Sequence, residues 1–253
     1  MMNESHLAFP IGILIATAVS SVGLGGGVLW MPFFLIILKL SPETAVVTSL
    51  LIQIAGMGSA SQAFARQKRI DYKLALWLLL IAIPGIAVGA LIVGKLKPAY
   101  MELIIGVLVM TTAFLFVSSN QKYDDLGKAR ADLAGAWPYL WVSAPASVIS
   151  GMLSISMSEW LIPMMRSKLA LKMSCAIGTC IFIAFGVCLF GALIHLIMGS
   201  RPNFETVLWA VPGVIIGGQI GPLITQRIDE RLLKEIFIFL LTLIGIHLIY
   251  NAY

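Results

Sequence analysis

Short polar breaks divide the chain into a series of apolar stretches. An apolar stretch of about 20 residues can cross the hydrocarbon core of a bilayer as a helix. In that environment every backbone N–H and C=O must be paired within the protein, which favours helices. Only 11% of the 253 residues are charged, whereas soluble domains carry about a quarter. The sequence therefore predicts an all-α polytopic membrane protein.

Two halves of the chain resemble each other. A shift of 131 or 132 residues superimposes a series of positions in the same order, which indicates a duplicated membrane protein. The predicted units are a first membrane repeat over 1–117, a linker over 118–136 and a second membrane repeat over 137–253. The matched pairs include Pro32 and Pro163, Thr48 and Thr179, Ser49 and Cys180, Trp77 and Trp209, Gly85 and Gly217, and Gly89 and Gly221.

Each half begins with a long apolar stretch that is interrupted near its middle. The long stretches cover 7–38 and 137–165, with breaks at 23–27 and 150–158. About 30 residues is too long for one upright helix and too short for two full crossings. Three ordinary spans follow in each half, predicted at 43–65, 74–94, 99–117, 173–198, 204–226 and 232–250.

The distribution of Lys and Arg indicates how the long stretches are arranged. If each crossed the bilayer once, the 17 cations would divide nine against eight between the two sides. If each enters and returns to its own side as a re-entrant hairpin, they divide thirteen against four. The second division matches the cytoplasmic excess of Lys and Arg in membrane proteins.

The re-entrant arrangement predicts two inverted repeats, each an interrupted helical hairpin plus three transmembrane helices. It places both termini in the periplasm and the linker in the cytoplasm of a bacterial inner membrane. The net charge of +5 lies in the loops, so it concerns topology, and no nucleic-acid partner is expected. Inverted repeats with broken helices are typical of secondary carriers, whose sites lie near the midplane.

The first break is glycine-rich and is a candidate anion site. Gly25, Gly26 and Gly27 lie between apolar segments, where non-helical backbone persists only if protein covers it or it lines a polar cavity. Glycine lets backbone N–H groups approach a ligand closely, and a helix that starts there adds a positive dipole end. The alternative is a plain hairpin turn with close helix contacts.

The second break carries hydroxyls where the first carries glycines. Ser154, Ser156 and Ser158 can donate hydrogen bonds to an oxyanion, and Glu159 follows them. A carboxylate at membrane depth is costly and marks a candidate functional position. Glu159 is a candidate for proton coupling. The alternative is that Glu159 lies nearer the surface and pairs with Arg166.

Polar side chains on the following helices are candidates for lining the same cavity. Thr48, Ser49 and Gln53 interrupt an apolar run, and Ser49 and Gln53 share a helix face. Thr179 holds the position of Thr48 in the second half. The alternative is that these hydroxyls bond to carbonyls or to neighbouring helices. The Gly-x-x-x-Gly pairs of both halves are predicted to serve helix packing.

Metal, cofactor and catalytic chemistry are not expected. Cys175, Cys180 and Cys188 lie in one apolar segment without His or carboxylates at ligand spacing, which favours packing roles. The apolar spans hold no paired His or Asp cluster and no Cys/His dyad at a recognisable spacing. The chain is therefore not expected to be an enzyme.

Several motifs of the first half resemble those of a known family. They are Gly23-Leu-Gly-Gly-Gly27 with Pro32, Ala45-Val-Val-Thr-Ser49, Arg69-Ile-Asp71 and the helix of Gly85 and Gly89. Together with the duplicated layout, these motifs are similar to those of the sulfite exporter TauE/SafE family, also called the 4-toluene sulfonate uptake permease family. Members often carry a glycine-rich turn in the second half, where this chain has Ser154-Ile-Ser-Met-Ser-Glu159.

The resemblance implies transport of a small sulfur-containing anion, such as sulfite, thiosulfate or an organosulfonate like sulfoacetate. The expected function is a secondary transporter that binds the anion near the midplane between the interrupted helices, with a proton or cation as coupling partner. The alternatives are an anion channel or a non-transporting membrane subunit, and then a membrane-embedded enzyme.

Overall fold

The computed structural model describes residues 4–93, 98–118 and 126–224, together with isolated positions between 238 and 250. Apart from one isolated bridge between Lys128 and Leu171, these residues form helices and the turns between them. Five of the described helical segments are long and apolar enough to cross a membrane, and they are Ser5–Val22, Pro42–Arg66, Tyr72–Val93, Met173–Ile197 and Phe204–Ile224. The fold is that of an all-α polytopic membrane protein, as the apolar stretches predict.

Shorter helices open each half, and long helices follow them. The helices of the first half are α1 (Ala8–Val22), α2 (Gly27–Pro32) with a π-helical continuation (Phe33–Ile37), α3 (Pro42–Arg66), α4 (Tyr72–Val93) and α5 (Pro98–Ser118). Those of the second half are α6 (Leu133–Ala136), the 3-10 turn Trp137–Val142, α7 (Ser143–Leu153), α8 (Ser158–Ser167), α9 (Met173–Ile197) and α10 (Phe204–Ile224).

The long helices match the predicted spans. The bounds of α3, α4, α5, α9 and α10 agree with them to within two residues at each end. Both α3 and α9 contain 25 residues. The span predicted at 232–250 lies largely outside the described residues, and α6 lies entirely within the stretch predicted as linker.

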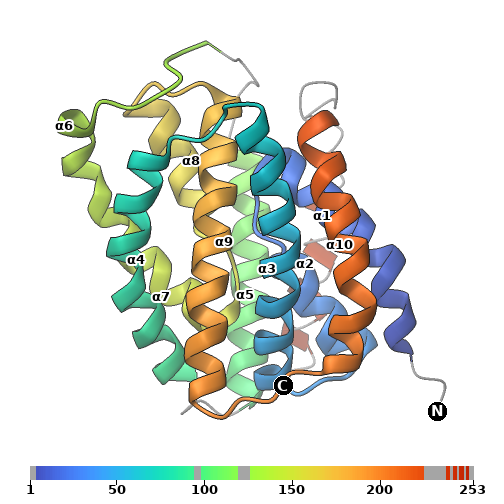
Figure 1. Ribbon diagram of the computed structural model, residues 1–253. Coiled ribbons are helices and arrows are strands. Elements are labelled where there is room, and N and C mark those ends of the chain that lie inside the picture. Colours follow the sequence, from blue (N-terminus) through green and yellow to red (C-terminus); the bar gives the residue numbers. More distant parts are fainter. Residues whose placement is uncertain are drawn as a thin grey trace.

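The first helix of each half packs against a long helix of the other half. α1 lies along α10 and α7 lies along α4, while α3 and α9 pack against each other at the centre (Figure 1). α3 and α9 run antiparallel, because Phe64 near the end of α3 touches Gly178 near the start of α9. At the other end, Thr48 of α3 is bonded to Asn203, which follows α9.

Glycines allow the close approach of these helices. A Cβ on Gly89 of α4 would collide with the carbonyl oxygen of Val148 in α7. A Cβ on Gly217 of α10 would lie 2.5 Å from the carbonyl oxygen of Ile13 in α1. The packing role predicted for the Gly-x-x-x-Gly pairs is confirmed.

Each interrupted stretch leaves and returns to one end of the bundle. The first begins beside the start of α10, where the hydroxyls of Ser5 and Thr206 are 3.4 Å apart, and it returns to Ser41, the N-cap of α3. The second begins after Ala131 and returns to Lys172, whose N–H donates to the Lys128 carbonyl at 2.8 Å. These two ends are opposite, because α3 connects one to the other.

The cations of the described residues gather at the linker end. That end joins the α3–α4 turn, the linker and the α8–α9 turn, since Asp71 accepts a hydrogen bond from the N–H of Ala131 at 2.7 Å. Lys39 and Arg201 lie at the opposite end. The cations at the linker end are Arg66, Lys68, Arg69, Lys73, Lys128, Arg130, Arg166, Lys168 and Lys172.

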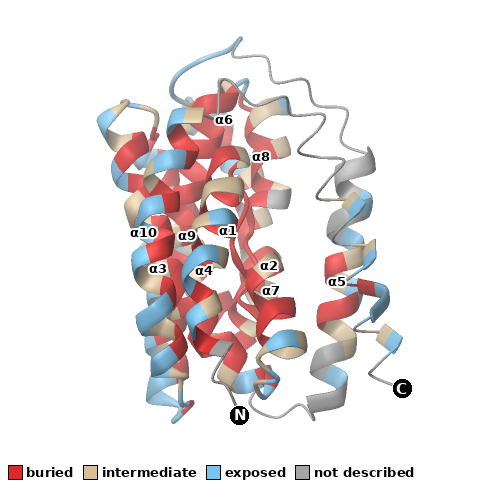
Figure 2. Ribbon diagram, turned by 90° about the vertical axis from the view of Figure 1, so that its right-hand side faces the viewer, coloured by how far each residue is buried: buried red, intermediate tan, exposed pale blue. Residues whose placement is uncertain are grey.

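The outer faces of the helices are apolar. Leu76 and Leu80 on α4 and Leu208 on α10 are 56%, 58% and 75% exposed. Figure 2 shows buried residues gathered between the helices and exposed positions on the outer sides of α3, α4 and α10. An apolar surface of this extent would be a liability in water, and it suits contact with lipid.

Candidate functional site

The first helices of both halves end in the same way. α1 ends at Gly23 with φ 82°, and α7 ends at Ser154 with φ 60°. A left-handed residue reverses the chain, and glycine adopts that conformation without a Cβ penalty. At Ser154 the same conformation costs about 1–2 kcal/mol. After these residues the chain is non-helical until α2 begins at Gly27 and α8 begins at Ser158.

The two breaks touch each other in the interior. We call residues 23–27 the glycine break and residues 154–158 the serine break. A Cβ on Gly25 would collide with the Cβ of Ser156, and one on Gly27 would collide with the carbonyl oxygen of Ser154. The glycines therefore provide the space in which the backbone of the serine break lies.

Gln53 of α3 links both breaks. Its Oε1 accepts a hydrogen bond from the N–H of Gly27 at 3.0 Å. Its Nε2 lies 2.9 Å from the Ser49 hydroxyl, 2.6 Å from the Ser154 hydroxyl and 3.2 Å from the Ser154 carbonyl. An amide has two N–H donors, so these three oxygens share them. Gln53 is 3% exposed, and an unpaired amide at that depth would be costly.

The other residues of the two breaks have their own partners. The Ser154 hydroxyl donates to that of Ser49 at 3.1 Å. The hydroxyls of Ser156 and Ser158 are 2.6 Å apart, and the Ser158 N–H donates to Ser156 Oγ at 3.1 Å. A Cβ on Gly26 would lie 3.3 Å from the Cγ of Gln53. The structure thus brings together the predicted residues of both breaks with Ser49 and Gln53.

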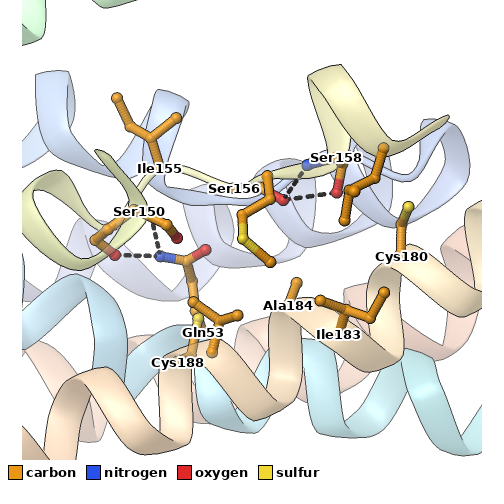
Figure 3. Close-up of a pocket in the computed structure, with 13 residues that line it drawn as sticks. Gln53, Ser150, Ile155, Ser156, Ser158, Cys180, Ile183, Ala184 and Cys188 are labelled. Atoms are coloured by element: carbon orange, nitrogen blue, oxygen red, sulfur yellow. Dashed lines mark hydrogen bonds between the residues drawn. The ribbon is translucent and has the colours of Figure 1, made fainter. Parts of the chain in front are cut away.

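Gln53 and the serine break line a small cavity together with residues of α7, α8 and α9 (Figure 3), whereas Ser49 and the glycine break are not among its lining residues. The cavity offers about 10 Å³ to the centre of a water-sized sphere, about the room that one water needs. None of its lining residues in the described part of the chain carries a charge. They are Gln53, Ser150, Ser154, Ile155, Ser156, Met157, Ser158, Leu161, Cys180, Ile183, Ala184, Val187 and Cys188.

Sequence reasoning missed three polar or thiol residues of the cavity. Cys180 and Cys188 of α9 face the serine break across the cavity (Figure 3), although the sequence favoured packing roles for them. A signal was present, because Cys180 holds the repeat position of Ser49 and Cys188 lies about two helical turns further on. Ser150 precedes Ser154 by one turn and belongs to α7 rather than to the break.

Thr48 and Thr179 are not among the residues that line the cavity. Thr179 accepts a hydrogen bond from the N–H of Asp71 at 3.0 Å, and Thr48 accepts one from the N–H of Asn203 at 2.9 Å. Asp71 and Asn203 in turn accept bonds from the first turns of α4 and α10. Each threonine thus binds the residue that caps the first turn of a helix in the other half, which is α4 for Thr179 and α10 for Thr48.

Glu159 lies in α8 directly after the serine break, and its side chain lies outside the described residues. The guanidinium of Arg166, the alternative partner suggested for it, donates to the carbonyls of Leu126 at 2.9 Å and Leu171 at 2.8 Å. Arg166 therefore connects the linker to the α8–α9 turn. The role of Glu159 stays a prediction.

Comparison with known proteins agrees with this architecture. The family model described as "Sulfite exporter TauE/SafE" matches residues 8–248. The chain is similar to the "Probable membrane transporter protein YunE" of Bacillus subtilis (strain 168), with 26% identity over an alignment 265 positions long that spans 96% of each chain. No solved structure matches the chain. The chain is a multi-pass membrane protein that belongs to the sulfite exporter TauE/SafE family.

Proposed function

We propose that this protein is a secondary transporter of a small sulfur-containing anion and that the anion binds where the glycine and serine breaks meet. Candidate substrates are organosulfonates such as sulfoacetate, together with sulfite and thiosulfate. The observation that carries the proposal is the Gln53 network, because it joins both interrupted stretches at one buried polar point. Membership of a transporter family supports the function in its coarser form.

The chemistry of the cavity suits a weakly basic oxyanion. A sulfonate offers three acceptor oxygens, and the lining supplies serine hydroxyls and the Gln53 amide. Without a cation in the described lining, the anion would be held by neutral donors. Binding of this kind is weak enough to allow release, which transport requires.

The cavity is closed to such a ligand in this conformation. Its free space suffices for about one water, so substrate entry requires the surrounding helices to separate. The glycine break belongs to the first half and the serine break to the second, and they meet where Gly25 lies against Ser156 and Gly27 against Ser154. Movement of one half relative to the other would open the site, as in carriers built from inverted repeats.

The charge distribution supports an inverted topology in the bacterial inner membrane. Nine described cations lie at the linker end and two at the opposite end, which favours a cytoplasmic linker and periplasmic termini. In the proposed arrangement α1 of the 1–117 repeat packs against α10 of the 137–253 repeat, and α7 of the 137–253 repeat packs against α4 of the 1–117 repeat. Activity of a cytoplasmic reporter fused to the C-terminus would contradict this orientation.

The coupling ion in this proposal is a proton or another cation. Glu159 is the proposed proton carrier because it adjoins Ser158 in sequence and follows the break directly. Replacement of Glu159 by Gln would then abolish the dependence of transport on a proton gradient. An unchanged pH dependence of uptake would remove Glu159 from the mechanism.

The test is counterflow in proteoliposomes loaded with sulfoacetate, sulfite or thiosulfate. Gln53→Met keeps the side-chain length and removes the amide, so we expect roughly tenfold to hundredfold weaker substrate affinity, the range for lost hydrogen bonds to a charged group. Ser61→Ala is the control, because Ser61 lies buried on the same helix and its hydroxyl has no hydrogen-bond partner in the described structure.

Three outcomes would contradict the proposal. One is the lack of exchange for all three anions. Another is wild-type affinity in a folded Gln53→Met protein. The third is flux without acceleration by substrate on the opposite side, which would identify an anion channel instead of a carrier.

A further inference from the structure

A second site candidate lies far from the breaks, on the outer surface between α3 and α10. These helices lie side by side on the face seen in Figure 1. A shallow, open groove runs between them, and we call it the α3/α10 groove. On α3 it extends from Ala55 to Arg66, which corresponds to about 17 Å along a helix.

The polar content of the groove is unexpected on a lipid-facing surface. Gln62 and Arg66 are exposed, and neither side chain has a hydrogen-bond partner among the described residues. Ser59 and Gln219 are bonded to each other, with Gln219 Nε2 2.9 Å from Ser59 Oγ. Ser59 Oγ also donates to the carbonyl of Ile215 at 2.8 Å. The polar groups of Ser59 and Gln219 in the inner part of the groove therefore have hydrogen-bond partners, while the donors of Gln62 and Arg66 in its outer part are available.

The groove changes from charged to apolar along its length. Arg66 is the last residue of α3 and lies at the cation-rich linker end, at the level expected for lipid head groups because a 25-residue helix exceeds the hydrocarbon core. Ala55 and Ile215 line the part nearer the centre of the bilayer. Beside them, α10 exposes Ile216 by 44%.

We propose that the α3/α10 groove binds an anionic phospholipid, with the head-group phosphate at Arg66 and Gln62 and an acyl chain along Ile215. The gradient of polarity fits an amphiphile lying along α3. Complementary charge selects an anionic head group, because basic positions between helices at the membrane surface attract anionic lipids. A guanidinium and an amide can hold two phosphate oxygens at once.

The site is specific to one side of the molecule. The repeat positions of Ser59, Gln62 and Arg66 on α9 are Phe190, Leu193 and Ile197. Those of Ile215 and Gln219 on α4 are Ile83 and Ala87. The face between α9 and α4 therefore lacks every polar group of the groove, so duplication alone does not account for them.

The test measures lipid binding to the purified full-length protein by native mass spectrometry. Phosphatidylglycerol and phosphatidylcholine with identical acyl chains are titrated separately, and thermal unfolding is followed without added lipid. We expect phosphatidylglycerol to bind more tightly. Arg66→Gln should reduce that preference about fivefold, the factor for one cation near an anionic head group. Gln62→Leu should also weaken binding.

Lys73→Gln is the matched control, because Lys73 is exposed at the same end but lies outside the groove. Retention of the preference in Lys73→Gln, with unchanged unfolding temperatures in all variants, would support the site. An equal loss in Arg66→Gln and Lys73→Gln would overturn it, since the effect would then be general attraction. Competition by inorganic phosphate alone, or a dimer that Arg66→Gln dissociates without bound lipid, would also overturn it.

Discussion

The glycine break and the serine break have the same place in the fold and opposite chemistry. Both follow a helix that ends in a left-handed residue, at Gly23 and at Ser154. The glycine break contributes empty volume, because Gly25 and Gly27 have no Cβ where the other backbone passes. The serine break contributes hydroxyls to the cavity.

This difference shows how a duplicated fold can build one asymmetric site. Two glycine-rich breaks would leave the centre without the serine hydroxyls, and side chains in place of Gly25 and Gly27 would collide with the other break. Gln53 connects the two contributions, since it accepts from Gly27 and donates to Ser154. The matching position in the second half, at an offset of 131, is Ala184, which also lines the cavity. The amide that connects the two breaks is therefore present in the first half and has no counterpart at the matching position of the second half.

The largest effect is expected from filling the space that the glycine break leaves. Gly27→Ala places a Cβ against the carbonyl oxygen of Ser154, and backbone cannot yield as a flexible side chain would. We expect destabilisation of about 3 kcal/mol or more and loss of transport. The measurements are the thermal unfolding temperature in detergent and counterflow.

Gly135→Ala is the control for this substitution. Gly135 is helical in α6, and a Cβ there would meet no atom within 4 Å. This variant should keep the unfolding temperature and the transport rate of the wild type. Equal stability of Gly27→Ala and Gly135→Ala would contradict the close contact between the two breaks.

Much of this arrangement could be predicted from the sequence, because membrane insertion leaves strong signals. Span length, loop cations and Gly-x-x-x-Gly spacing record the interaction of each helix with lipid or with one neighbour. The bounds of the second break were less accurate. The sequence predicts it at 150–158, yet Gly151 remains helical in α7, where a Cβ on it would collide with the backbone of Ile86 in α4.

The sequence could not predict which polar residues meet at the site. That depends on the relative depth of helices from different halves, which hydropathy does not encode. Ser49 and Thr48 are adjacent on α3, yet only Ser49 points to the serine break, while Thr48 bonds to Asn203. The cavity thiols were missed for the same reason, since an apolar helix face and a cavity wall have the same composition.

An intermediate effect is expected at Ser154, where two substitutions separate strain from hydrogen bonding. Ser154→Ala and Ser154→Gly both remove the hydroxyl that lies 2.6 Å from Gln53 Nε2. Both should weaken substrate affinity about tenfold. Ser154→Gly should be about 1 kcal/mol more stable than Ser154→Ala, because it relieves the left-handed conformation at φ 60°. Unfolding temperatures and the KM of uptake provide the measurements.

Either of two results would contradict this interpretation of Ser154. Equal stability of the two variants would mean that the φ of 60° carries no strain. A wild-type KM in both variants would remove the Ser154 hydroxyl from the binding site. A loss of affinity with the expected difference in stability would assign the hydroxyl to binding and the conformation to the fold.

The smallest effects are expected at Thr48 and Thr179, which bind the residues that cap the first turns of α10 and α4. Thr179→Val and Thr48→Val keep the side-chain shape and remove one acceptor each, so each should cost about 1 kcal/mol without changing the KM of uptake. The costs should differ, because Asp71 is 4% exposed whereas Asn203 is half-buried and water can replace its lost partner. The unfolding temperature should therefore fall further for Thr179→Val than for Thr48→Val. The reverse order would mean that the exposure of the unpaired N–H does not determine the loss of stability.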